Sequence, residues 1–119
     1  MFQSTQRQSY QDFQEALEQL RKTVATTNLE VAALQDSFQD VQLLFQSQIA
    51  NMSSDDMAPD YVSRWQSFYT EIYKQMRLLE TDIMLLQASR SSATSRSRTA
   101  TVSDRINTLI QYCEALLQL

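Results

Sequence analysis

The sequence contains no glycine and one proline, Pro59, in 119 residues. All-β folds need many tight turns, and those turns favour residues that adopt positive φ, glycine above all. The scarcity of such residues argues against a sheet and favours a few long helices joined by a few loops. A chain of this length suits one continuous core. We therefore predict an all-α fold, with residues 1–119 forming a single helical-bundle domain.

Histidine is also absent, which removes the most common general base, the usual nucleophilic triads and most zinc sites. Without glycine, a phosphate-binding loop of the usual kind cannot form. Residues 51–60, NMSSDDMAPD, are rich in aspartate but lack the glycine and the terminal glutamate of an EF-hand calcium loop. We expect no catalytic residue, no cofactor and no metal, and therefore no enzyme.

The single cysteine, Cys113, has no second thiol with which to pair. It falls on an apolar helical face, where a buried and reduced thiol is expected. The amino terminus has no apolar stretch typical of a signal peptide, and no apolar run is long enough to span a membrane. These features predict a cytoplasmic protein that does not enter a membrane.

Apolar residues spaced alternately three and four apart are abundant, and this period keeps one face of a helix toward its neighbours. Helices are expected at about residues 3–25, 28–50, 60–88 and 98–118. Their predicted apolar faces are Tyr10, Phe13, Leu17, Leu20 and Val24; Val31, Leu34, Phe38, Val41, Phe45 and either Ile49 or Met52; Val62, Trp65, Tyr69, Ile72, Met76, Leu79, Ile83 and Leu86; and Val102, Ile106, Leu109, Cys113 and Leu116.

The first link is short, which forces the two helices that it joins into an antiparallel hairpin. Thr27 followed by Glu30 has the form of a capping box for the second helix, and Asn28 is an alternative cap. Pro59 suits the first turn of the third helix. The sequence thus predicts an antiparallel up-down four-helix bundle with a long third helix.

The last two apolar faces are two residues out of phase across the polar stretch ASRSSATSRSRTAT, residues 88–101. Two residues rotate a helix by roughly 200°, so one straight helix cannot bury both faces. We predict a break between Ser89 and Ser97. The last helix then starts between about Ser91 and Ser103, with Ser103 or an earlier serine or threonine as its cap.

The third helix carries more apolar residues than one buried face requires. Leu78 and Leu85 lie one heptad apart on nearly the opposite side, Met84 lies on a flank, and Tyr73 lies toward the edge of the core face. A second apolar stripe indicates contact on two sides. Either this helix is central in the monomer, or these four residues form an interface with a protein partner or with a second copy.

The charged residues are unevenly divided along a chain of net charge −4: residues 1–60 hold nine acids and three bases, whereas residues 61–119 hold five acids and seven bases. An acidic surface disfavours duplex DNA, and the short stretch of arginines and hydroxyls is a weak signal for single strands. We expect no nucleic-acid partner. The asymmetry reflects either packing of an acidic half on a basic half, or a basic patch at Arg90, Arg96, Arg98 and Arg105 that recruits an acidic partner.

The carboxy-terminal half, from FYTEIYKQMRLLETDIMLLQASRSSATSRSR through VSDRINTLIQYCEALL, resembles the PatD family of filamentous cyanobacteria, which controls heterocyst frequency. The stretches SYQDFQEALEQLR and LEVAALQDSFQDVQLLF fit the same pattern, so the resemblance covers most of residues 9–117. It implies a cytoplasmic regulator of cell differentiation that acts through protein contacts, with the tubulin-like division protein FtsZ as the first partner to test. No catalytic residue is carried over, because the resemblance includes no catalytic motif.

Two other functions stay open at this point. The first is a structural or chaperone-like helical homodimer with no dedicated signalling partner. The second is a sensor that holds a small apolar ligand in the bundle core, which requires a cavity.

Overall fold

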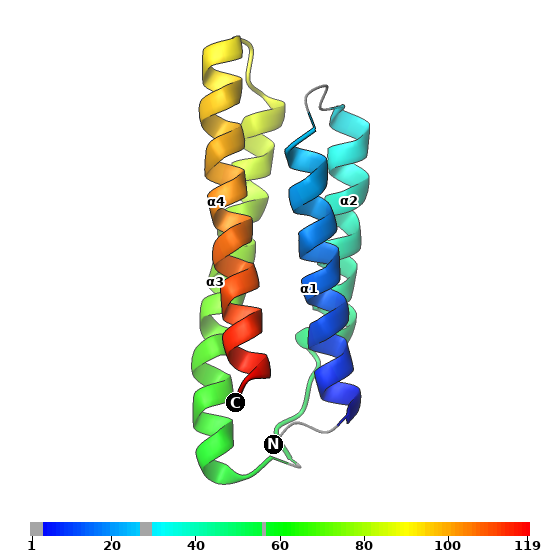
Figure 1. Ribbon diagram of the computed structural model, residues 1–119, viewed down its shortest axis with the longest axis vertical. Helices are drawn as coiled ribbons and strands as arrows, with labels where there is room; N and C mark the ends of the chain where they lie inside the picture. Colours follow the sequence, from blue (N-terminus) through cyan, green and yellow to red (C-terminus); the bar gives the residue numbers. More distant parts are fainter. Residues whose placement is uncertain (1–3, 27–29, 56) are drawn as a thin grey trace.

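The computed structural model describes residues 4–26, 30–55 and 57–119, and the helices within them run alternately up and down (Figure 1). They are α1 (Ser4–Val24), α2 (Val31–Leu44), the π-helical segment η1 (Phe45–Ile49), α3 (Pro59–Gln87) and α4 (Ser92–Leu117). No strand occurs in these ranges. The molecule measures 50 × 20 × 20 Å. The predicted antiparallel four-helix bundle is confirmed, and its third helix is the longest at 29 residues.

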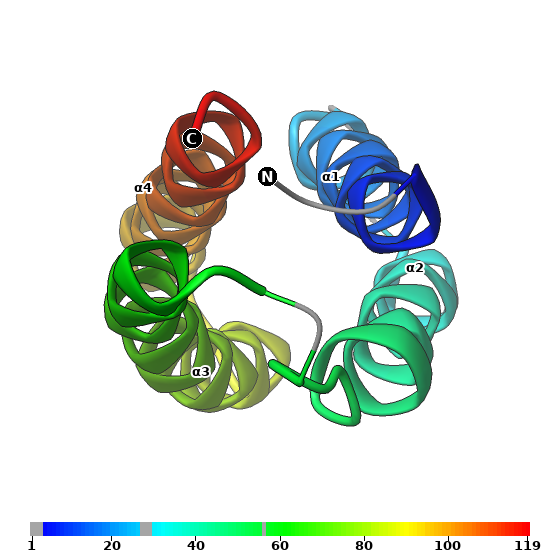
Figure 2. The ribbon, with the colours of Figure 1, turned by 90° about the horizontal axis from the view of Figure 1, so that it is seen from below.

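The bundle consists of two hairpins, α1 with α2 and α3 with α4. Helices α1 and α4 join the hairpins by packing side by side, whereas α2 and α3 make the fewest close backbone approaches of the four adjacent helix pairs. Figure 2, along the axis, shows the four helices around one core. The link between α2 and α3 crosses the end of the bundle at which α4 finishes (Figure 1). One side of the bundle is therefore less tightly closed than the other three.

The predicted apolar faces form the core, with a few corrections. Val31 is 52% exposed, because it is the first residue of α2 and its side chain leans back past the helix end. Ile49 is fully buried and Met52 only half-buried, so Ile49 completes the second face. Ile110 is buried as well, next to the predicted Leu109. Among the residues described, none of the helices has the length and hydropathy needed to cross a lipid bilayer.

The end of the second helix is a π-helical turn. The amide of Ala50 donates to the carbonyl of Phe45 at 2.7 Å, a bond that spans five residues. Phe45 and Ile49, four residues apart, lie on the same side of this segment, and both are buried. The predicted helix 28–50 is thus α2 followed by η1, and it begins three residues late at Val31. Thr27 and Asn28, the proposed caps, lie outside the described residues; Glu30 occupies the cap position without a side-chain bond.

The fourth helix starts six residues earlier than the predicted range 98–118. Ser91 takes an extended backbone conformation and caps it: its Oγ accepts from the amide of Thr94 at 3.1 Å and donates to Thr94 Oγ1 at 2.9 Å. The break is therefore confined to residues 88–91, and Ser103 lies inside the helix. Periodicity missed the first turns because they contain no large apolar residue, so local capping decides the helix start.

Tyr10 and Trp65 form a polar contact inside the core. The indole N–H of Trp65 donates to Tyr10 Oη at 3.0 Å, and both side chains are buried. Burial raises the pKa of the Tyr10 phenol well above its ordinary value, because the charged form would lose its hydration. The bond gives the buried indole N–H of Trp65 an acceptor, and it joins α1 to the first half of α3.

We expect Ser91→Ala to lower the free energy of unfolding by about 1 kcal/mol, the usual cost of losing a serine cap. Ser97→Ala replaces an exposed serine within α4 and should change it by no more than about 0.5 kcal/mol. Chemical denaturation followed by circular dichroism measures both values. Equal effects of the two substitutions would contradict the cap at Ser91.

Replacing Tyr10 by phenylalanine should cost about 1 to 2 kcal/mol of stability, because the buried indole N–H of Trp65 then has no acceptor. Tyr112→Phe is the matched control: Tyr112 is half-buried, and its ring contact with Phe68, 6.3 Å between centroids, survives loss of the hydroxyl. Its unfolding midpoint in urea should stay close to that of the wild type. If Tyr10→Phe leaves the free energy of unfolding unchanged, the bond contributes nothing to stability.

Candidate functional site

The described residues offer little reactive chemistry. They contain no group of three or more cysteine, aspartate or glutamate side chains arranged to hold a metal ion. The thiol of Cys113 is fully buried, and burial raises its pKa to about 12. A thiol in that state is a poor nucleophile, because the thiolate is the reactive form. What the molecule presents to other molecules is its surface.

Helix α3 supplies most of the large apolar side chains that the described surface exposes. The six such side chains are Val31, Leu43, Tyr73, Leu78, Met84 and Leu85. The last four are the interface candidates identified from the sequence, with exposures of 44%, 37%, 62% and 46% respectively. Since no element of the described chain covers Leu78 and Leu85, the alternative in which this helix is central within the monomer is wrong.

Leu78 and Leu85 lie on the outward side of α3, next to α4. The flank of α3 that meets α4 is marked by Gln75 and Asp82, which both accept from Arg105 of α4: Nε reaches Asp82 Oδ2 at 2.9 Å and Nη1 reaches Gln75 Oε1 at 3.1 Å. Each leucine follows one of these acceptors by three residues, which makes it the next position outward on the helix surface. We call Leu78 and Leu85 the α3 ridge.

Tyr73 and Met84 lie on the other flank of α3, which faces α2. The ring of Tyr73 lies 6.1 Å from that of Phe45 at the end of the second helix, measured between centroids. Met84 borders a hollow of about 300 Å³ together with Phe38 of α2. The structure therefore does not bring the four candidates together: two form the ridge and two lie beside α2.

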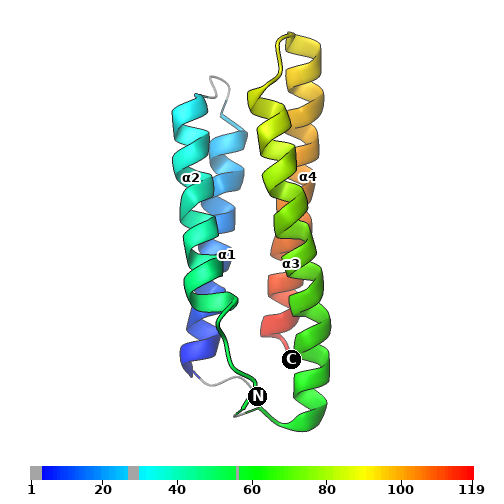
Figure 3. The ribbon, with the colours of Figure 1, turned by 180° about the vertical axis from the view of Figure 1, so that it is seen from behind.

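Between α2 and α3 runs a groove, formed by two adjoining hollows of about 260 and 300 Å³ that share Gln42 and Glu80. Figure 3 shows the side of the bundle where these two helices lie in front. We call it the α2–α3 groove. Its apolar lining residues are Phe38, Phe45, Tyr73, Met76, Ile83 and Met84. The groove follows the seam with the fewest close backbone approaches.

Four glutamines of the second helix line the same groove: Gln35, Gln39, Gln42 and Gln46. Their spacing of four, three and four places them on one flank of the helix. Each amide can donate and accept hydrogen bonds, so this wall suits an uncharged polar surface. The sequence analysis missed these residues, although the same periodicity that identified the apolar faces would have found them.

A broader hollow of about 650 Å³ lies on the outside of the α1–α2 hairpin. It is lined by Asp12, Glu15 and Asp40 together with the exposed Leu43. It contains none of the predicted interface residues and is separate from the α2–α3 groove.

Comparison with known proteins identifies no relative of this chain: no family model, no curated protein and no solved structure matches it. The candidate site therefore depends on the geometry of α3 and its neighbours.

Because Cys113 is buried, we expect it to resist thiol reagents in the native protein at pH 8 and to react fully in denaturant, as measured by mass spectrometry after alkylation. Below pH 9.0, the ordinary pKa of the thiol, folded and unfolded chains both keep the proton. Above it the unfolded chain loses the proton first, so stability should fall by up to about 1.4 kcal/mol per pH unit.

The matched comparison for this pH dependence is Cys113→Ala, which removes the titrating thiol. The variant should lose stability through its cavity at every pH, but the fall between about pH 9 and 10 should be shallower than in the wild type. Rapid native labelling at pH 8, or identical slopes in the two proteins, would contradict the burial of this thiol.

Proposed function

We propose that the chain is a non-enzymatic, cytoplasmic regulator of the PatD type, which controls heterocyst frequency by binding a partner protein through helix α3. The observation that carries this proposal is the exposure of Leu78 and Leu85 on a helix whose opposite face is fully used by the core. A helix needs one apolar stripe to pack in a bundle, and the second stripe is available for a partner. Burying each half-exposed leucine adds roughly 1 kcal/mol of binding free energy.

The partner that we propose first is the division protein FtsZ. The sequence resemblance to the PatD family supports this choice, and the lack of a metal-binding cluster in the described chain, with its one thiol buried, favours action by contact. The ridge provides the apolar centre of such a contact. Charged residues beside it, among them Lys74 and Glu71, are positioned as a polar rim.

Leu78→Glu combined with Leu85→Glu should abolish binding to purified FtsZ, because two carboxylates would be desolvated in the contact. The matched control is Gln66→Glu with Thr70→Glu, which adds the same charge to exposed positions earlier on α3 and should bind like the wild type. Binding is measured by biolayer interferometry. The circular dichroism spectrum and the cooperative melting of both variants should match the wild type, because all four positions lie outside the core.

The same variants separate this proposal from the homodimer alternative. Self-association would be established instead by two results together. The wild type would sediment as a dimer and the variant Leu78→Glu with Leu85→Glu as a monomer, and none of the proteins would bind FtsZ. Unchanged FtsZ binding by this variant would remove the α3 ridge from consideration. Absence of FtsZ binding by a monomeric wild type would reject FtsZ as the partner.

A further inference from the structure

One end of the bundle concentrates positive charge. Here α1 finishes with Arg21 and Lys22 in its last turn, and the α3–α4 link and the first turns of α4 carry Arg90, Arg96 and Arg98. Figure 1 shows that α1 ends, and α4 begins, at this end of the molecule. Four of these five side chains are exposed, and Arg98 is half-buried. We call the five residues the basic end.

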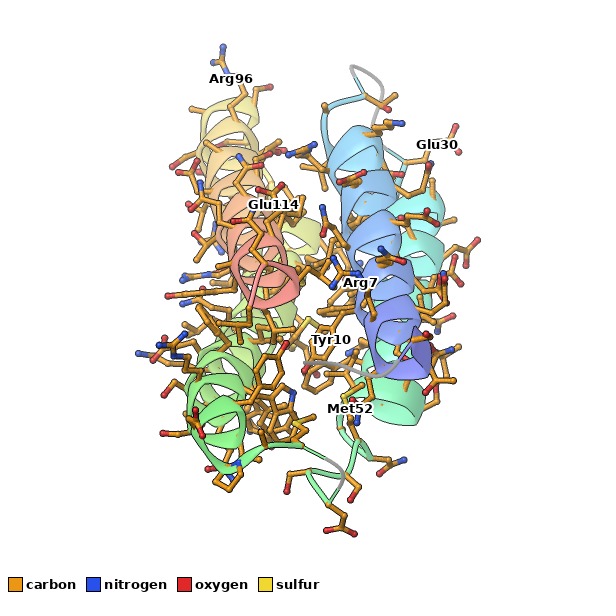
Figure 4. All side chains as sticks on the ribbon, turned by 60° about the horizontal axis from the view of Figure 1, so that its bottom comes forward. Arg7, Tyr10, Glu30, Met52, Arg96 and Glu114 are labelled. Carbon is orange, nitrogen blue, oxygen red and sulfur yellow. The ribbon has the colours of Figure 1, made fainter. Side chains whose placement is uncertain are left out.

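Little negative charge balances the basic end. In the described chain around this end, Glu30 stands at the start of α2, and the exposed Asp36 and Asp104 lie further along α2 and α4, so the five cations outnumber the nearby acids. Figure 4 shows Glu30 and Arg96 as separate projections from two different helices. The ion pair found among the described residues is that of Arg105 with Asp82, and none of the five cations of the basic end takes part in it. The local charge is therefore opposite in sign to the net charge of −4.

The tertiary structure changes which residues form the basic patch that the sequence predicts. Arg105 leaves it, because its guanidinium is bound by Asp82 and Gln75 between α3 and α4. Arg21 adds a cation from α1, further along α4 than Arg98: its Nη1 donates to Asn107 Oδ1 at 3.0 Å and so holds the end of α1 against α4. The amide of Asn107 is neutral, so Arg21 keeps its full charge for a partner.

The surroundings of these cations indicate which anion they suit. Residues 92–101, SATSRSRTAT, contain no aromatic side chain and no apolar side chain larger than alanine. Single-stranded nucleic acid needs aromatic platforms on which bases stack, and a membrane surface needs an apolar helix face to insert. Guanidinium groups bind carboxylates and phosphates alike through two parallel N–H···O bonds, so it is the lack of aromatic and large apolar side chains that favours a carboxylate partner. The exposed hydroxyls of Ser92 and Ser97 add donors for further carboxylate oxygens.

We propose that the basic end binds an acidic segment of a partner protein, a stretch rich in aspartate and glutamate, with Arg96 and Arg98 as its main contacts. These two residues lie on the part of α4 that extends beyond α1 and α2 (Figure 1), about 200° apart around the helix axis, so the acidic segment must cross α4 to contact both. The negative charge of the remaining surface repels the acidic segment elsewhere and directs it to this end. This proposal does not depend on the α3 ridge or on FtsZ.

The test uses the full chain and a fluorescent peptide composed of aspartate and glutamate, with fluorescence anisotropy as the readout. We expect the wild type to bind at low salt and to bind more weakly as salt is added. Arg96→Gln with Arg98→Gln should weaken binding about tenfold, whereas Arg96→Lys with Arg98→Lys should keep part of the affinity. The matched peptide of asparagine and glutamine should not bind.

The control variant is Arg64→Gln with Arg77→Gln, which removes the same charge from exposed positions on α3 and leaves Lys74, which belongs to the polar rim of the α3 ridge, in place. It should weaken peptide binding by less than about twofold. An equal loss in both double variants would overturn the proposal, because general charge would then explain the binding. So would failure of the wild type to bind the acidic peptide at low salt. Tighter binding to anionic vesicles or to single-stranded DNA, lost with Arg96→Gln and Arg98→Gln, would assign the basic end to that class of partner instead.

Discussion

The burial of four apolar helix faces against one another is the interaction on which the rest of this structure depends. Helices of this length are marginal in water by themselves, and this chain has few other stabilising devices: one ion pair among its described residues and one cysteine, which is free. The core also explains the polar contact of Tyr10 with Trp65. The indole of Trp65 can be buried there because the Tyr10 hydroxyl accepts its N–H.

The same packing decides which surfaces remain for binding. Three of the four helix seams are closely packed, and the seam between α2 and α3 is left wider. Its walls are the glutamines of the second helix and the flank of α3 that carries Tyr73 and Met84. On the opposite flank the bonds of Arg105 to α3 occupy the polar side chains at the α4 seam and leave Leu78 and Leu85 outside it. Helix α3 thus presents an apolar ridge and one wall of a groove, and a partner can contact either.

Periodicity identified the helices whose buried faces are apolar, and it failed where a segment has no such face. The faces through Leu17, Ile72 and Ile106 are in the core as expected, because spacing alone places such residues on one side of a helix. The start of α4 was predicted only as a window from Ser91 to Ser103, and it lies at the beginning of that window, because the first turns are stabilised by the Ser91 cap and not by packing. The candidate site was found in part: the exposure of Leu78 and Leu85 follows from their position opposite the core face, but the groove does not.

The sequence by itself determined the all-α class, the core residues and the surplus of apolar side chains on the third helix, because these depend on spacing within one helix. Only the tertiary structure decided which helices are neighbours. That arrangement turned Tyr73 toward Phe45, neutralised Arg105 with Asp82 and brought Arg21 against Asn107 of α4. Such relations join residues far apart in the chain, so no local pattern encodes them. They follow from which helices are neighbours in the bundle and from how closely those helices pack.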